Sequence, residues 1–193
     1  MFILEVTLMN PPNTSREEIM RVSRKIVSEK GLPALNMRTL AKECGIALGT
    51  LYNYYSDKDE LVVAAIESVW QDILEKSAPD SGVRFSQYVM HIYARILSGL
   101  KDYPDFFAAH SISVAGSAKG KARGTMERCF GKIRGELHAA LREDKNVDRS
   151  IFSETFREED LIEHILDTIT ISIINGKPDC ATLTEILDRL LYR

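Results

Sequence analysis

Residues 40–55 have the sequence LAKECGIALGTLYNYY, a pattern typical of two short helices joined by a tight turn. Ala41 is small enough to let two helices cross closely. Gly45, four positions later, tolerates the positive φ that a tight turn requires. Apolar side chains stand on both sides of the turn at the spacing of inward-facing positions, at Leu40, Cys44, Ile46 and Leu51. The pattern predicts a helix-turn-helix with Cys44 buried in its turn.

The second helix of this pair is expected to turn a small, polar and aromatic face outward. The positions on this face are Leu48, Gly49, Thr50, Tyr52 and Asn53. Such a face suits entry into a DNA groove. Three tyrosines within four positions cannot all point to one side of a helix. We therefore predict that Tyr55 is buried and Tyr52 exposed, and the position of Tyr54 stays open between the two.

The residues that follow make the pattern more specific. Residues 49–61 have the sequence GTLYNYYSDKDEL, and residues 19–61 as a whole resemble the tetracycline-repressor (TetR) family of bacterial transcriptional regulators. The resemblance implies a three-helix DNA-binding module. It also implies DNA contacts at Arg38, Thr50, Tyr52, Tyr54 and Lys58. Further candidates for DNA contact are Thr39, Leu48, Gly49 and Asn53, and the alternative for Asn53 is a solvated helix residue. The chain departs from the family at Ala47, where Ser or Thr is common, and loss of that capping hydroxyl costs about 0.5–2 kcal/mol.

Helical periodicity continues through the chain after Pro12, and no Asn-Gly or Asp-Gly turn separates alternating apolar runs. We predict an all-α protein in three parts. Residues 1–12 form a flexible arm, residues 13–60 form the helix-turn-helix domain, and residues 61–193 form a helical bundle for ligand binding and dimerisation. The expected helices span about 15–30, 37–44, 48–55, 57–76, 83–100, a short segment after Pro104, 117–142, 158–175 and 180–192.

The composition sets limits on the class of protein. The chain has 193 residues, 45% hydrophobic and 27% charged, which is ordinary for a globular protein and disfavours disorder and collagen. No stretch reaches the roughly 20 apolar residues of a membrane span. Residues 1–9 are apolar but lack a basic region, so we expect a loosely ordered arm or an over-long start before Met9, not a signal peptide. Three cysteines far apart indicate no disulfide framework and favour the cytoplasm.

The charge balance bears on how DNA would be bound. With 25 basic and 28 acidic residues the formal charge is −3, which argues against binding nucleic acid through bulk charge. Residues 11–60 carry eight basic and seven acidic side chains, an excess of one positive charge. A single module of this kind cannot hold DNA tightly by charge alone, which favours two modules on one duplex.

The last two helices support a homodimer. Residues 161–174 carry too many Ile and Leu side chains for one apolar stripe. Apolar side chains of the last helix step by three and one, at Leu183, Ile186, Leu187, Leu190 and Leu191. In the family that the sequence resembles, such a pair meets its copy in a four-helix interface. We therefore expect a homodimer through about 158–175 and 180–192. The alternative is that both helices only complete the core of a monomer.

Aromatic and basic residues of the bundle are candidates for a pocket that binds a small-molecule effector. They are Trp70, Tyr88, His91, Arg95, Phe106, Phe107, His110, Met126 and Phe130. The alternative is that they fill the core, as such residues often do. The histidines match no metal-binding spacing, His138 is expected to face solvent, and no nucleophile–base set appears. We expect no metal, no cofactor and no enzymatic activity.

Together these expectations describe a cytoplasmic, ligand-responsive, sequence-specific DNA-binding transcriptional regulator. It would act as a repressor that a small-molecule effector releases from a double-stranded DNA operator. The helix at 57–76 would link the two domains and carry the effector signal. The alternative is a helical module that binds a ligand or a protein and has no operator.

Overall fold

The computed structural model describes residues 14–75, 82–104, 106 and 119–192, and every regular element in these ranges is helical. Eight α-helices and two short 3-10 helices follow one another, and no strand forms among the described residues, so the all-α prediction is confirmed. None of the described helices combines the length and the apolar character that crossing a membrane requires. The predicted arm at 1–12 and the helix expected after Pro104 lie outside the described residues.

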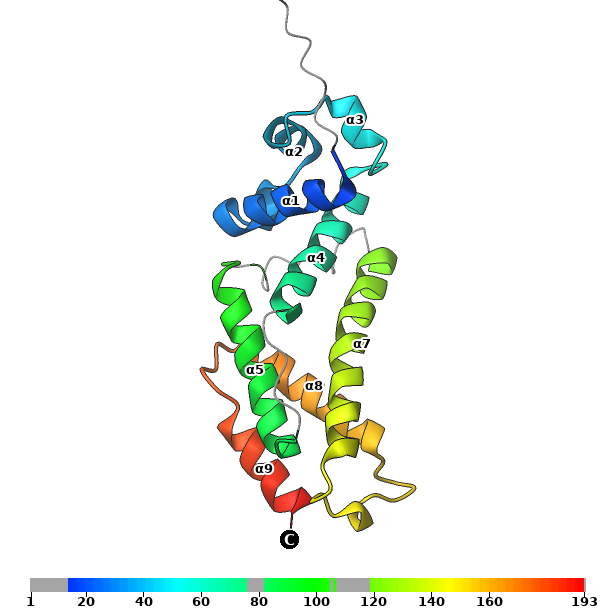
Figure 1. Cartoon of the computed structure of the whole chain (residues 1–193), viewed down its shortest axis with the longest axis vertical. Helices are drawn as coiled ribbons and strands as arrows, with labels where there is room; N and C mark the ends of the chain where they lie inside the picture. Colours follow the sequence, from blue (N-terminus) through cyan, green and yellow to red (C-terminus); the bar gives the residue numbers. More distant parts are fainter. Residues whose placement is uncertain (1–13, 76–81, 105, 107–118, 193) are drawn as a thin grey trace, which may run out of the picture.

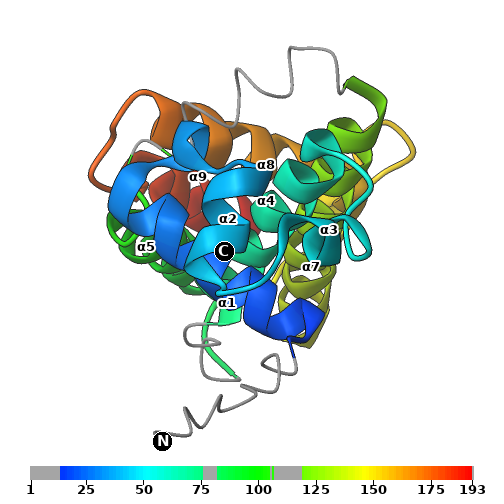
Figure 2. The ribbon, with the colours of Figure 1, turned by 90° about the horizontal axis from the view of Figure 1, so that it is seen from above.

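The molecule is elongated, with α1, α2 and α3 at one end and α9 at the other (Figure 1). Seen along the long axis, the three N-terminal helices lie over the bundle formed by the others (Figure 2). One continuous core of buried apolar side chains runs from Ile19 in α1 to Leu191 in α9. The two ends of the molecule are therefore joined by packing as well as by the chain.

Helix α1 spans Arg16–Lys30 and begins where the sequence predicts it. The Oγ atom of Ser15 accepts a hydrogen bond of 3.1 Å from the backbone N–H of Glu18, which satisfies one of the free amides at the start of the helix. The carboxylate of Glu18 does not complete a capping box; it pairs with Arg21 at 2.6 Å. The helix ends at Gly31, which takes a φ of 78°.

Helix α2 spans Met37–Glu43 and helix α3 spans Leu48–Tyr52, with the turn between them at Gly45, whose φ is 66°. The prediction that α3 continues to residue 55 is wrong. The backbone N–H of Tyr54 bonds the carbonyl of Leu51, three residues back, at 3.0 Å. That spacing tightens the last turn and ends the helix early. Cys44, predicted to be buried, is half-buried and packs at the edge of the core.

Helix α4 spans Lys58–Glu75 and belongs to both ends of the molecule. Its start is capped from both directions: the N–H of Glu60 donates to Oδ1 of Asp57 at 2.7 Å, and Oε2 of Glu60 accepts from the N–H of Ser56 at 2.7 Å. From there α4 packs against α1 on one side and against α5 and α7 on the other. A shift of α4 in the bundle would therefore be transmitted directly to the N-terminal helices.

The bundle contains α5 at Phe85–Lys101, α7 at Lys119–Glu143, α8 at Glu158–Ile174 and α9 at Ala181–Leu191. Short 3-10 helices lie at Leu32–Ala34 and Arg149–Ile151. Helices α4 and α5 cross closely at Gly99, where an added Cβ would lie 2.7 Å from Cγ2 of Ile73. At the far end, buried Asp144 accepts hydrogen bonds from the N–H of Phe85 and from the hydroxyl of Tyr192.

Candidate nucleic-acid interface

Helix α3 has one buried side and one exposed side. Leu51 is completely buried and Tyr55, just after the helix, is 2% exposed, which confirms the prediction that Tyr55 lies in the core. On the opposite side Leu48 is 36% exposed and Tyr52 is 48% exposed. The remaining predicted positions of this face, Gly49, Thr50 and Asn53, are also exposed. Helix α3 lies at the tip of the molecule, so this face is open to a large partner (Figure 1).

Tyr54, also an expected DNA contact, is half-buried, and its side chain and backbone are engaged within the protein. Its hydroxyl donates a hydrogen bond to the carbonyl of Thr14. Its own carbonyl accepts a hydrogen bond of 2.8 Å from Nη2 of Arg16. The sequence left the place of Tyr54 open, because these partners lie about 40 residues away along the chain.

Two predicted cations flank α3. Arg38 on α2 and Lys58 at the start of α4 are exposed. Within the part of the chain that the structure describes, neither forms an ion pair, so both charges remain available to an anionic partner. Thr39 is half-buried, and its backbone N–H donates to Oδ1 of Asn36 at 3.0 Å to cap α2. The side of α2 that carries Arg38 also carries a cation that sequence reasoning missed.

That cation is Lys42, which is exposed on α2 four positions after Arg38. Residues at i and i+4 share a face of a helix. The spacing was visible in the sequence and was the signal that pointed to Lys42. By contrast, the charge of Lys30 is already paired within the protein, because its Nζ atom lies 3.2 Å from Oε1 of Glu43.

The predicted effector residues divide into separate groups. Trp70 is buried and lies 6.1 Å from Phe106 and 6.2 Å from Phe130, measured between ring centroids. Arg95 is buried and pairs with Glu136 at 2.5 Å. Tyr88 is half-buried beside a hollow of about 420 Å³ between the start of α5 and the end of α7.

His91 does not join either group. It is exposed on α5, whereas Arg95, one turn later, is buried, so the two do not line one cavity. The side chains of Phe107, His110 and Met126 lie outside the described residues. His138, expected to face solvent, is half-buried, and its Nδ1 atom is buried. Among the described residues no cluster of His, Cys, Asp and Glu is arranged to hold a metal ion.

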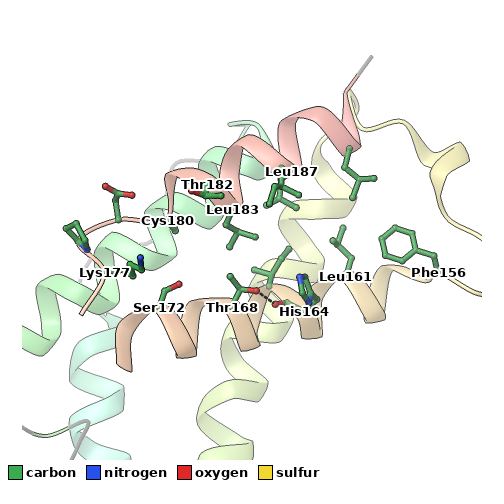
Figure 3. A pocket seen from close by; sticks show the side chains of 15 residues that line it. Phe156, Leu161, His164, Thr168, Ser172, Lys177, Cys180, Thr182, Leu183 and Leu187 are labelled. Atoms are coloured by element: carbon green, nitrogen blue, oxygen red, sulfur yellow. Dashed lines mark hydrogen bonds between the residues drawn. The ribbon is translucent and has the colours of Figure 1, made fainter. Parts of the chain in front are cut away.

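The larger hollow is a groove of about 700 Å³ between α8 and α9 (Figure 3). Leu161, Leu183 and Leu187 point into it, and Phe156 stands near one end and Lys177 near the other. Ile186 is 55% exposed and Leu190 is 38% exposed on its α9 side. Cys180 lies in its wall, and burial raises the pKa of that thiol to about 11, so it remains protonated at neutral pH. The groove is thus mainly an apolar surface.

Comparisons with known proteins show which proteins the N-terminal part of the chain is similar to. A family model described as "Bacterial regulatory proteins, tetR family" matches residues 19–65, which include α2, α3 and the start of α4. An uncharacterized HTH-type transcriptional regulator of Haemophilus influenzae is 32% identical over 45% of this chain and 53% of that protein. The HTH-type transcriptional regulator UidR of Escherichia coli is 31% identical over 39% of each chain. The chain thus spans about two fifths to one half of these curated relatives.

Solved structures extend the likeness to the whole fold. The multidrug binding protein EbrR, crystallised with proflavin, superposes with a TM-score of 0.59 at 16% identity, covering 91% of this chain and 98% of that one. TetR from Acinetobacter baumannii superposes with a TM-score of 0.51 at 15% identity, covering 93% and 100%. At these identities the likeness concerns the arrangement of helices alone.

Proposed function

Through residues 19–65 this chain belongs to the tetR family of bacterial regulatory proteins, and we propose that it binds a specific DNA operator as a ligand-responsive repressor. The observation that carries this proposal is the face of α3. It exposes Tyr52 and Thr50 at the tip of the molecule while Leu51 anchors the helix from behind. Members of this family are transcription regulators and not enzymes. The proposed role of the site is to contact a DNA groove rather than to catalyse a reaction. We place this activity in the cytoplasm, where DNA is accessible.

The cations around α3 supply the contacts that hold a duplex. Arg38 and Lys42 on α2 and Lys58 on α4 are exposed beside the helix that would enter the major groove, and none of them forms an ion pair with another described residue. Phosphate contacts of this kind set the position of a protein on DNA, and side chains in the groove read the bases. Thr50, Tyr52 and Asn53 are the side chains in place for that reading.

Binding is proposed to need two copies of the chain. The helix-turn-helix domain, here called the head, carries an excess of only one positive charge over residues 11–60. One head alone therefore releases few counterions and binds DNA weakly. The groove between α8 and α9 leaves Ile186 and Leu190 exposed, and Ile171 and Ile174 are further exposed apolar side chains of α8. A second copy seated on this surface would bury these side chains. Two recognition helices would then meet major grooves about 34–36 Å apart.

The effector is proposed to bind inside the bundle. EbrR, which shares this arrangement of helices, was crystallised with proflavin, an observation on that protein that supports a small-molecule ligand for this chain. In this chain the aromatic group of Trp70, Phe106 and Phe130 lies between α4 and α7. A ligand entering beside these rings would press on α4 directly.

Polar contacts couple the bundle to the head. Nη1 of Arg24 on α1 donates to Oγ of Ser68 on α4 at 2.5 Å. Oγ of Ser28 on α1 donates to the carbonyl of Asp102, at the end of α5, at 2.6 Å. A shift of α4 or of the end of α5 would therefore tilt α1 and the helices packed on it. Such a change releases DNA only if the effector binds the released state better than the bound one.

The test uses a duplex that the protein itself selects from a random-sequence pool. Fluorescence anisotropy then gives the operator affinity at several salt concentrations for the wild type, Lys58→Ala and a control, Lys145→Ala, placed beyond the end of α7. Each lost phosphate contact reduces the dependence of log K on log salt by about 1, so a dimer that loses Lys58 from both copies should show a reduction of about 2 and weaker binding to all sequences alike. Lys58→Ala should show both effects and Lys145→Ala neither.

The same measurement separates the alternative, a helical module that binds a ligand or a protein. Such a module would select no sequence from the pool, and any residual DNA binding would not depend on Lys58. Recovery of a two-fold symmetric sequence with half-sites about one helical turn apart supports the proposed dimeric repressor.

A further inference from the structure

The start of α1 and the end of α3 are joined by a reciprocal pair of hydrogen bonds. The hydroxyl of Tyr54 donates to the carbonyl of Thr14, directly before the cap of α1. In the opposite direction Nη2 of Arg16 donates to the carbonyl of Tyr54 at 2.8 Å. The guanidinium of Arg16 also lies over the ring of Tyr55, 5.2 Å from its centroid. We call this arrangement the α1–α3 clasp.

Helix α3 depends on contacts with the rest of the protein to hold its angle. It contains five residues, far fewer than a helix needs to be stable alone. Ala47 at its N-cap makes no side-chain hydrogen bond, so the four amides of its first turn receive no help from a cap. Leu51 and Tyr55 anchor the helix to the core, but apolar burial is not directional, whereas hydrogen bonds are.

The clasp acts at the opposite end of α3. The carbonyl of Tyr54 follows the last turn, where backbone acceptors lack partners within the helix and the helix dipole favours a positive charge. Arg16 supplies both the donor and the charge there. Because the two bonds run in opposite directions between segments 38 and 40 residues apart, they restrain both the position and the rotation of α3 relative to α1.

We propose that the clasp aligns α3 for entry into the DNA groove, and that Tyr54 and Arg16 are positioning residues of operator binding rather than DNA contacts. The proposal rests on the proposed function and adds a role that the exposed face of α3 does not reveal. It predicts that the hydroxyl of Tyr54 affects affinity without touching the duplex. The hydroxyl of Tyr52, exposed on the same helix, provides the matched comparison because it faces outward.

The test compares the wild type, Tyr54→Phe and Tyr52→Phe, with Glu154→Gln at an exposed loop position as a control. Hydrogen exchange of the free chain reports how well residues 48–55 are held. Anisotropy on the selected duplex reports affinity and its salt dependence, and titration at concentrations far above Kd counts the competent fraction. Tyr54→Phe should speed exchange at residues 48–55 and weaken binding about 2- to 10-fold, the range expected for one lost hydrogen bond, with an unchanged salt slope.

Other results of this test would overturn either the clasp or the proposed function. A lower salt slope for Tyr54→Phe would mean that this hydroxyl contacts phosphate, and unchanged affinity or unchanged exchange would equally overturn the clasp. A reduced competent fraction with unchanged Kd would show a merely structural role and reject positioning. Failure of the wild type to select any duplex would overturn the proposed function instead, which separates the two results. Tyr52→Phe should leave exchange unchanged, and Glu154→Gln should match the wild type in both measurements.

Discussion

The hydroxyl of Tyr103 donates a hydrogen bond of 2.8 Å to Oδ2 of Asp72, and this bond ties the segment after α5 to α4. Asp72 also lies 3.9 Å from Nε of Arg24 on α1. Burial, followed by the hydrogen bond to Asp72, raises the pKa of Tyr103 well above its ordinary value, so its hydroxyl keeps its proton. Helices α1 and α4 and the segment after α5 therefore meet at one partly exposed carboxylate.

Replacing Tyr103 by Phe removes this bond and leaves the ring in place. Hydrogen bonds to charged groups contribute about 1.5–3 kcal/mol when well shielded, and partial exposure of Asp72 reduces that figure. We expect Tyr103→Phe to lower the free energy of unfolding by about 1 kcal/mol in urea titrations. Tyr88→Phe, in the same domain, should change it by less than half as much. Equal values for the two variants would contradict the importance of the Asp72 contact.

The close crossing of α4 and α5 makes Gly99 sensitive to any side chain. A Cβ at this position would lie 2.7 Å from Cγ2 and 2.9 Å from Cγ1 of Ile73, both inside the core. We expect Gly99→Ala to destabilise the protein by about 1–3 kcal/mol through overpacking. The control is Gly135→Ala in α7, where nothing lies within 4 Å.

At Gly135 alanine improves the helix propensity of α7, so Gly135→Ala should stabilise the protein by up to about 1 kcal/mol. Thermal and urea unfolding measure both changes. Opposite signs for the two glycines are the expected result, and a stabilised Gly99→Ala variant would show that the two helices lie farther apart than the structure places them.

The apolar groove predicts the oligomeric state. A glutamate at Ile186, which is 55% exposed on α9, would place a charge in the proposed contact between copies. We expect Ile186→Glu to halve the mass measured by sedimentation and to weaken operator binding, because one head alone carries little charge. Met90→Glu is the control, since Met90 is equally apolar and 45% exposed but lies on α5, away from the groove.

A wild-type chain that sediments as a monomer would rule out this use of the groove. A dimer that persists in Ile186→Glu would place the contact elsewhere on the molecule. Because the substituted side chain is exposed in the single chain, the variant should keep its helical content, which circular dichroism checks.

Asp144 should make stability depend on pH in the acid range. Burial alone would raise its pKa, but hydrogen bonds from Tyr192, Phe85 and Asn146 outweigh burial and lower it. A lowered pKa in the folded state adds stability above the unfolded value, about 3.9, and that stability is lost as the pH falls through the folded value. We expect Asp144→Asn to lower the free energy of unfolding at pH 7 by about 1–3 kcal/mol.

The variant should also lose less further stability between pH 5 and pH 3 than the wild type does. Glu154→Gln, at an exposed loop position, is the control and should follow the wild-type curve. Urea unfolding at the three pH values checks both expectations. An unaltered acid dependence in Asp144→Asn would assign the effect to other carboxylates.

Local features of the chain account for what could be predicted from sequence. The cap at Ser15, the cap at Asp57 and the turn at Gly45 depend on residues within three or four positions, so their geometry follows from nearby side chains and backbone limits. The exposed face of α3 follows from helical periodicity in the same way. These features were enough to indicate the helix-turn-helix and the all-α fold.

The details of the sites depend on partners far away in the chain. Periodicity marks a helix face as apolar without saying which other helix covers it, which is why Arg95 is buried against Glu136 while His91 is exposed. The engagement of Tyr54 by Thr14 and Arg16 requires packing of α1 beside α3, and the open groove of α8 and α9 requires the bundle to close without covering it. Such contacts form only when the whole chain is packed, because their energy comes from groups that the sequence does not place side by side.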